Sequence, residues 1–130
     1  MKDFHRLSVW EKSHKLTLAI YYSTKTFPKE EMVGLTNQMR RSSTSIPTNI
    51  AEGCGRGSQA ELSNFFNIAM GSSSELEYQL ILAHDLHYLE DNRFLELTEQ
   101  LLEVRRMLNS LISKVKRDNV ASNQALKAKS

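Results

Sequence analysis

Hydrophobic residues recur along this chain at spacings of three and four, which is the period of an amphipathic α-helix. The every-second-residue alternation typical of a half-buried strand is absent. The pattern predicts four long helices, over about 8–25, 29–52, 58–89 and 91–117. Because short connections between long helices favour antiparallel neighbours, we expect an all-α, up-down-up-down antiparallel four-helix bundle.

The positions expected to face the core follow from the same spacing. They are Val9, Leu16, Ala19, Ile20 and Ser23; Leu35, Met39, Ser42, Ile46 and Ile50; Leu62, Phe65, Phe66, Ala69, Ser73, Leu76, Leu80 and Ala83; and Phe94, Leu97, Leu101, Val104, Leu108, Leu111 and Val115. The last set alternates steps of three and four, as in a heptad seam. Pro47 should kink the second helix or remove one backbone hydrogen bond. The small residues 71–74 could interrupt the third helix, but they also permit close packing, and we predict a continuous helix.

Two helix starts carry a capping box, in which a serine hydroxyl accepts a backbone N–H and a glutamate three residues later reaches back. One pairs Ser8 with Glu11, and the other pairs Ser58 with Glu61. At the other end of the chain, the polar segment 118–130 is predicted to be a disordered tail. We therefore expect one bundle domain over residues 1–117, which suits a chain of 130 residues.

Composition and targeting signals agree with a cytoplasmic globular protein. Hydrophobic residues make up 40% of the chain and charged residues 25%, as in ordinary globular domains. No apolar run approaches the roughly 18 residues of a membrane span. The charged N-terminus leads into no signal-peptide core. A cytoplasmic protein without a membrane partner is the expectation.

Charge is distributed unevenly along the chain, although the net charge is only +2. Residues 1–57 hold nine Lys or Arg and five acids, residues 58–103 one Arg and nine acids, and residues 104–130 seven Lys or Arg and one acid. In an antiparallel bundle, many of the cations gather at the end that holds the start of the first helix and the end of the fourth. Such a charged end steers oppositely charged partners.

This basic end is the candidate nucleic-acid-binding site. It comprises Lys2, Arg6, Lys12, Arg56, Lys114, Lys116 and Arg117. Clustered cations bind phosphates with release of condensed counterions. Cations near helix C-termini also complement the helix dipole, and Asp3, Glu11, Glu61 and Asp118 dilute the charge of this end. Nucleic-acid binding and dipole compensation both remain open as explanations.

Residues with catalytic or metal-binding chemistry are present without the partners they need. His84 and His87 offer two imidazoles about one turn apart but no further ligand for a metal. The loop 53–57 has the glycines of a phosphate cradle but lacks the lysine and the strand of a P-loop, and a helix C-cap explains it more simply. Cys54 has no protease context. We expect no catalytic residue, no metal site and no cofactor, hence no enzyme.

Other polar and aromatic residues lie at or beside core spacing. The polar set Ser45, Asn49, Glu52, Ser72 and Glu75 is interpreted as a buried network that fixes the register of the second and third helices, with an active site as the alternative. Trp10, Tyr21, Tyr22 and Tyr78 either broaden the core or cover a subunit interface. In the pairs Arg40–Arg41 and Arg105–Arg106, neighbours point about 100° apart. One member of each is expected to contact a partner or a phosphate and the other to pair with acids of a neighbour. An ion pair at a subunit interface is favoured over nucleic-acid contact.

Several of these residues also carry a family resemblance. The central stretch is Ser45-Ile46-Pro47-x-Asn49-Ile50-Ala51-Glu52-Gly53-x-Gly55-Arg56, followed by Phe65-Phe66-x-Ile68-Ala69-x-Gly71-Ser72 and Glu75. With these motifs, residues 4–117 resemble the bacterial four-helix-bundle family of 23S ribosomal-RNA intervening-sequence proteins. The accessory variability determinant of diversity-generating retroelements is a relative of that family.

The resemblance implies a cytoplasmic bundle that assembles as a ring, typically a homopentamer, with a basic surface suited to nucleic acid. In the retroelement relative it also implies association with a reverse transcriptase. The leading hypothesis is thus a non-enzymatic homo-oligomer that binds RNA or DNA, in particular structured RNA or a ribonucleoprotein, through its basic end. The alternative is a protein-interaction scaffold that docks an enzyme such as a reverse transcriptase.

Overall fold

The computed structural model describes residues 3–129, and within that range it contains helices and no strand. The elements are a short 3-10 helix η1 (Phe4–Arg6), α1 (Ser8–Thr24), a second 3-10 helix η2 (Lys29–Val33), α2 (Leu35–Cys54), α3 (Gln59–Asp85) and α4 (Asp91–Lys129). The prediction of an all-α protein with four long helices is confirmed. The third helix is continuous through residues 71–74, as predicted.

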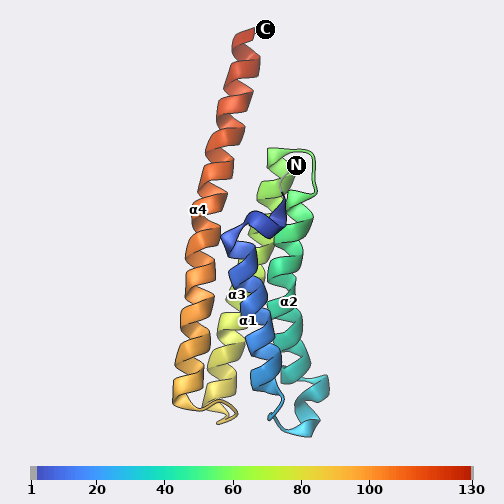
Figure 1. The fold of residues 1–130 in the computed structure, drawn as a ribbon, viewed down its shortest axis with the longest axis vertical. Coiled ribbons are helices and arrows are strands. Elements are labelled where there is room, and N and C mark those ends of the chain that lie inside the picture. The colour runs from blue at the N-terminus through green and yellow to red at the C-terminus, as the bar shows by residue number, and fades with distance from the viewer. Residues whose placement is uncertain (1–2, 130) are drawn as a thin grey trace.

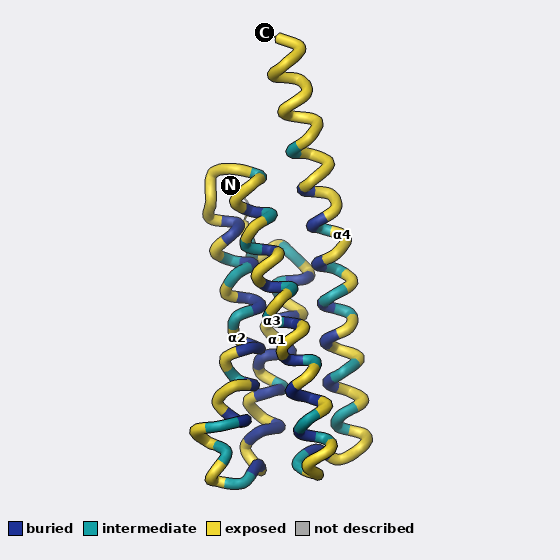
Figure 2. Tube along the Cα trace, turned by 180° about the vertical axis from the view of Figure 1, so that it is seen from behind, coloured by how far each residue is buried: buried dark blue, intermediate teal, exposed yellow. Residues whose placement is uncertain are grey.

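The four helices pack around one core. Each of α1 and α3 packs against both α2 and α4, whereas the diagonal pairs do not pack against each other. Figure 1 shows the α2–α3 connection at one end of the molecule and the α1–α2 and α3–α4 connections at the other. The chain therefore reverses direction between successive helices. The buried residues follow the inner side of each helix in Figure 2.

The predicted core faces are buried, with a few shifts at their edges. Ala19, Phe65, Phe94 and Leu111 are only partly buried. On α4 the buried position after Leu108 is Ile112 rather than Leu111, so a step of four replaces the predicted step of three. A straight α-helix drifts by about 20° per heptad from a strict seven-residue repeat, which moves the buried stripe to the next position.

Pro47 does not end α2, which runs through it from Leu35 to Cys54. Proline lacks the N–H that would bond to the carbonyl of Ser43, four residues earlier. The hydroxyl of Thr17 on α1 donates to that carbonyl instead, over 2.9 Å. The backbone bond that the sequence predicts to be lost is replaced by a side chain from a neighbouring helix.

The helix ends differ from the sequence predictions in three places. Ser8 is the first residue of α1, and the N-cap, Leu7, has no side-chain bond, so the first capping box is not formed. The helix predicted over 29–52 divides at Gly34 into η2 and α2. The third helix ends at Asp85 instead of Leu89, and His87 beyond it adopts a left-handed backbone with φ of 63°. At the second predicted box, Ser58 Oγ does accept the N–H of Glu61, over 3.1 Å.

The end of α4 projects beyond the other helices (Figure 1). The sequence predicts a disordered tail over 118–130, whereas the structure continues α4 to Lys129. Residues 118–129 include no Gly or Pro and contain Ala, Gln, Leu and Lys, which favour a helix. From 116 to 129 every residue except Asn119 is exposed. No helix in the described range is both long and apolar enough to cross a membrane.

Candidate functional site

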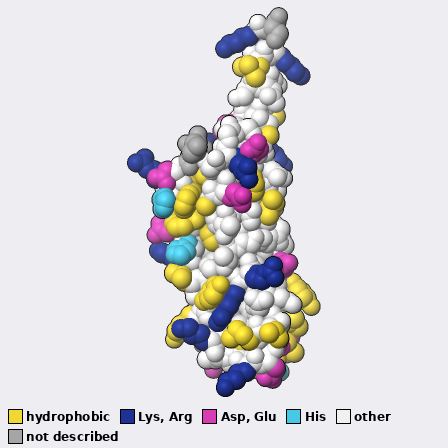
Figure 3. All heavy atoms as spheres, turned by 90° about the vertical axis from the view of Figure 1, so that its right-hand side faces the viewer, with side chains coloured by type: hydrophobic (Ala, Val, Ile, Leu, Met, Phe, Trp, Pro, Cys, Tyr) yellow, Lys and Arg dark blue, Asp and Glu magenta, His cyan; other side chains and the backbone are white. Residues whose placement is uncertain are grey.

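The cations near the end of α4 are the least constrained part of the predicted basic end. Lys114, Lys116 and Arg117 are exposed on α4, and none of them forms an ion pair with a described residue. Lys127 and Lys129 follow in the last turn, within the segment 118–130 that the sequence predicts to be a tail outside the basic end. Figure 3 shows lysine or arginine side chains at the tip of the projecting helix with no acidic side chain beside them.

The remaining predicted cations are constrained by acids of the same chain. Lys12 Nζ lies 2.9 Å from Glu103 Oε1, which links α1 to α4. Arg56 lies 3.2 Å from Glu52 and stacks over the ring of Phe65. Arg6 is at the edge of ion-pair distance from Asp3, at 4.0 Å. Lys2 lies outside the described residues.

Asp3 keeps a negative charge at this end of the bundle. Its Oδ1 lies 2.8 Å from Nδ1 of His5, and the His5 N–H of the backbone donates to the same oxygen over 3.1 Å. The side-chain hydrogen bond to His5, followed by the backbone bond, lowers the pKa of Asp3 from its ordinary value. Asp3 therefore offsets part of the positive charge of Arg6 near neutral pH.

In each arginine pair the two side chains point in different directions, as helical geometry requires. The partly buried members, Arg40 and Arg105, both make contacts within the chain. Arg40 donates to Thr24 Oγ1 over 3.0 Å and lies over the ring of Tyr21. Arg105 pairs with Glu77, joining α4 to α3. Arg40 and Arg105 are thus engaged within the chain, and pairing with acids of a neighbouring subunit stays a prediction for the other member of each pair. Their neighbours Arg41 and Arg106 are exposed.

The predicted polar contacts between α2 and α3 exist, with one member missing, but they lie at the surface instead of in the core: Ser45, Asn49 and Ser72 are partly buried and Glu75 is exposed. Ser45 Oγ lies 2.7 Å from Ser72 Oγ, and the amide of Asn49 donates to the carbonyl and hydroxyl of Ser45. One turn along, the Ser42 hydroxyl donates to Glu75. Glu52 is not part of this network, because it is exposed and pairs with Arg56 instead.

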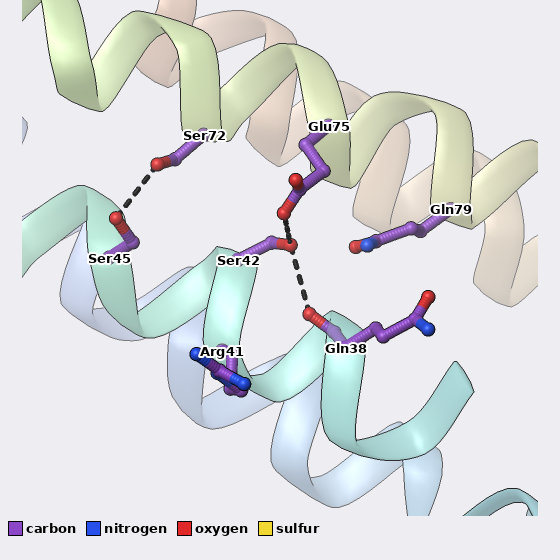
Figure 4. Close-up of a pocket in the computed structure, with 7 residues that line it drawn as sticks. All are labelled: Gln38, Arg41, Ser42, Ser45, Ser72, Glu75 and Gln79. Carbon is purple, nitrogen blue, oxygen red and sulfur yellow. Dashed lines mark hydrogen bonds between the residues drawn. The ribbon is translucent and has the colours of Figure 1, made fainter. Parts of the chain in front are cut away.

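Four of these residues, Ser42 and Ser45 on α2 and Ser72 and Glu75 on α3, face each other across an open polar groove between the two helices (Figure 4). Its volume is about 380 Å³, and it is lined by Gln38, Arg41, Ser42, Ser45, Ser72, Glu75 and Gln79. The sequence predicts Ser45, Ser72 and Glu75 as members of a polar network but does not predict Gln79, because a glutamine at a core spacing gives no signal of its partners. Only the packing of two helices decides whether such an amide is bonded.

The other sequence candidates lie apart from both regions. His84 stacks on Phe94 and lies 2.7 Å from Asp91, while His87 is exposed. No group of three metal-ligating side chains occurs among residues 3–129. In the glycine loop, the N–H of Gly55 bonds to the carbonyls of Ala51 and Glu52, as in a helix C-cap. Cys54 is buried.

Comparison with known proteins identifies relatives of the whole bundle. A model of the family of 23S rRNA-intervening sequence proteins matches residues 5–110. A crystal structure of a protein of unknown function, from the S23 ribosomal protein family of Bacteroides thetaiotaomicron, superposes with a TM-score of 0.75 at 27% sequence identity. The match covers 81% of this chain and 95% of that chain. No curated protein matches the chain in sequence.

Proposed function

The chain belongs to the 23S rRNA-intervening sequence protein family, and from that premise we propose that it is a non-enzymatic nucleic-acid-binding protein of the cytoplasm. The proposed ligand is structured RNA or a ribonucleoprotein, with duplex DNA as the comparison. The proposed site is the end of α4, where Lys114, Lys116 and Arg117 are joined by Lys127 and Lys129. Arg6, Lys12, Arg56 and Lys2 have a secondary role in this proposal.

One observation carries the proposal: the cations at the end of α4 are exposed and form no ion pair with an acid among residues 3–129. Residues 114–129 contain five Lys or Arg against a single acid, Asp118. Cations that serve stability usually contact acids of their own chain, as Lys12 and Arg105 do here. Unpaired exposed cations instead release counterions when they meet phosphates, which favours binding to a polyanion.

We further propose that copies of the up-down-up-down bundle assemble as a ring, with five members as the family resemblance implies. In a ring of parallel copies, the projecting ends of α4 would lie on the same rim. Several weak phosphate sites on one polyanion gain avidity without any new contact. Sedimentation or light scattering should then give a mass near five times the 14.9 kDa of one chain. A monomeric mass at micromolar concentration would contradict the ring.

The decisive experiment measures binding of a fluorescent structured RNA and a duplex DNA across a range of salt. Wild-type protein is expected to bind at low salt and to weaken steeply as salt rises. A variant with Lys114→Glu, Lys116→Glu and Arg117→Glu should lose binding while it keeps the helical content of the wild type. Unchanged RNA binding by this variant would refute the proposed site.

A matched control separates a local site from a general charge effect. Lys15→Glu, Lys25→Glu and Lys29→Glu together change the net charge by the same amount on other exposed parts of the surface. This control should retain most of the affinity, because it leaves α4 intact. If both triple variants lose binding equally, only the net charge of the protein matters and the α4 site is wrong.

The alternative function is a scaffold that docks a protein such as a reverse transcriptase. It is favoured by exposed apolar side chains on the bundle surface, notably Leu18, Tyr22 and Tyr78, which are 56%, 69% and 62% exposed. Aromatic residues are enriched at protein interfaces. Partner binding that survives the triple substitution on α4 but is lost in Tyr22→Ser would support the scaffold.

A further inference from the structure

The polar groove between α2 and α3 contains a buried acceptor that has no partner. Gln79 on α3 is 6% exposed, and its Oε1 is buried without a hydrogen bond to any residue that the structure describes. Figure 4 shows the Gln79 amide directed from α3 into the groove, towards the side on which Ser42 and Gln38 lie. A buried, unpaired polar atom costs about 1–3 kcal/mol, so it requires an explanation. A ligand that donates to Gln79 provides one.

The rim of the groove carries one group of each charge. Arg41 is exposed and forms no ion pair with a described residue. Glu75 accepts a hydrogen bond from Ser42 through one oxygen, and its other oxygen has no hydrogen bond to a described residue. The lining is therefore neutral in sum: it offers acceptors at Glu75 and Gln79 on α3 and a donor at Arg41 on α2. It favours an uncharged group of a ligand, such as a nucleobase, over an anionic or a cationic group.

From this arrangement we propose that the groove binds the edge of an unpaired guanine base. Guanine has two adjacent donor groups, the N1–H and the exocyclic amine, next to the acceptors O6 and N7. The two donors can bond to the acceptors of Glu75 and Gln79. Arginine is the usual protein partner of O6 and N7, and Arg41 supplies one here. A volume of about 380 Å³ is within the range of small-molecule sites, which begins at about 300 Å³.

The other bases fit this set of groups less well. Adenine presents one exocyclic amine between the acceptors N1 and N7, and cytosine presents one exocyclic amine beside the acceptor N3. Uracil presents a single N–H between two carbonyls. Each would leave Glu75 or Gln79 facing an acceptor, and a site built to receive donors rejects such analogues. The groove is therefore expected to discriminate guanine from adenine.

This inference deepens the proposed function, on which it rests for the idea of a nucleic-acid ligand. Phosphate contacts give affinity without sequence preference, whereas contacts to base edges give specificity. Unpaired bases of single-stranded RNA are commonly read on these edges by side chains. The cations of α4 would thus supply affinity and the groove would supply a preference for accessible guanine. Free guanine nucleotides offer the same edge.

The test follows the side-chain amide resonance of Gln79 by NMR while guanosine or adenosine monophosphate is added. Guanosine monophosphate should shift this resonance, and adenosine monophosphate should bind at least about fivefold more weakly, the lower bound for a good base contact. Equal binding of both nucleotides would overturn the inference. So would the absence of any shift at millimolar guanosine monophosphate.

Two variants separate binding from folding. Glu75→Gln keeps an acceptor for Ser42 but loses the carboxylate, and Gln79→Leu removes the unpaired amide. Since NMR loses its probe in Gln79→Leu, calorimetry measures binding in all variants. Both substitutions should weaken the binding of guanosine monophosphate by about fivefold or more. Gln79→Leu should leave the melting temperature equal or higher, because it removes a buried unsatisfied group.

Glu99→Gln, on the exposed side of α4, is the matched control and should bind guanosine monophosphate as the wild type does.

The source of the guanine is resolved with a short single-stranded RNA that contains one guanine. A preference for this RNA over its adenine counterpart, lost in Glu75→Gln, assigns the groove to nucleic acid. Binding of the free nucleotide without that RNA preference assigns it to a mononucleotide. If RNA binds through α4 but neither ligand depends on Glu75 and Gln79, the groove inference fails and the proposed function stands. If guanosine monophosphate binds but RNA does not, the proposed function fails alone.

Discussion

The two halves of α4 form one continuous helix but are held in different ways. From Asp91 to Val115 the helix buries an apolar stripe against α1 and α3 and forms ion pairs through Glu103 and Arg105. From 116 to 129 nearly every residue is exposed, and helix propensity is the main source of order. The comparison teaches that packing commits side chains to stability. Charges on the unpacked half remain available to a partner.

The largest expected difference between the two halves is in the free energy of unfolding when the same negative charge is introduced into each. Leu101 is 0% exposed, whereas Leu126 is 65% exposed. Leu101→Asp buries a carboxylate without a partner and should cost about 4 kcal/mol or more, enough to unfold most of a marginally stable domain. Leu126→Asp should shift the free energy of unfolding by less than about 0.5 kcal/mol. Denaturant titration measures both, and similar midpoints for the two variants would remove the distinction between the halves.

Two glycines extend the contrast between packed and open surroundings. A Cβ added at Gly53 would lie 2.9 Å from Cβ of Phe65, whereas a Cβ at Gly71 would meet nothing within 4 Å. Gly53→Ala should therefore destabilise by about 1–3 kcal/mol through overpacking between α2 and α3. Gly71→Ala should stabilise by about 0.5–1 kcal/mol through helix propensity. If both variants shift the melting temperature in the same direction, this packing argument is wrong.

The hydroxyl of Thr17 gives a smaller effect; it lies 2.9 Å from the carbonyl of Ser43 and 3.0 Å from that of Ser13, in its own helix. Thr17→Val keeps the shape but leaves the Ser43 carbonyl without its donor, at a cost of about 1–2 kcal/mol. Pro47→Ala restores a backbone N–H for the same carbonyl. In a double-mutant cycle, the cost of Thr17→Val should therefore shrink in the Pro47→Ala background. Additive effects of the two substitutions would contradict the role assigned to Thr17.

The smallest effect is expected from removing the projecting end. A chain that stops after Arg117 loses exposed residues that bury little surface, so its free energy of unfolding should stay within about 0.5 kcal/mol of the full chain. Amide exchange in the full chain should be fastest over 118–129, since local opening there breaks few contacts. A clear drop in the melting temperature of the truncated protein would mean that this segment packs against a second copy.

Much of the bundle could be predicted because it follows from local pattern. Met39, Ile46, Leu80 and Leu108 were assigned to the core from spacing alone and are fully buried. The errors lie where neighbouring helices or loops decide. Ile112 replaces Leu111 because a straight helix drifts from the heptad. The capping box at Ser8 is absent because the helix begins there rather than after it.

The candidate sites were harder to predict, because their chemistry depends on pairing. Lys12 and Arg56 looked equivalent to Lys116 in the sequence, yet acids on other turns or helices engage the first two. Gln79 gave no signal, although its buried amide oxygen is the most unusual polar atom of the groove. Charge along a sequence gives the number of cations but does not say which of them remain free.

The sequence by itself therefore determined the four helices and the residues that face the core, since both depend on the 3.6-residue period of a single helix. Only the tertiary structure decided which polar groups satisfy one another: Thr17 with Ser43, Arg105 with Glu77, and Ser42 with Glu75. The physical reason is that the two kinds of interaction differ in how precisely their partners must be placed. Hydrophobic burial is non-directional and tolerates small shifts, whereas a hydrogen bond or ion pair requires two distant residues to meet within a few ångströms.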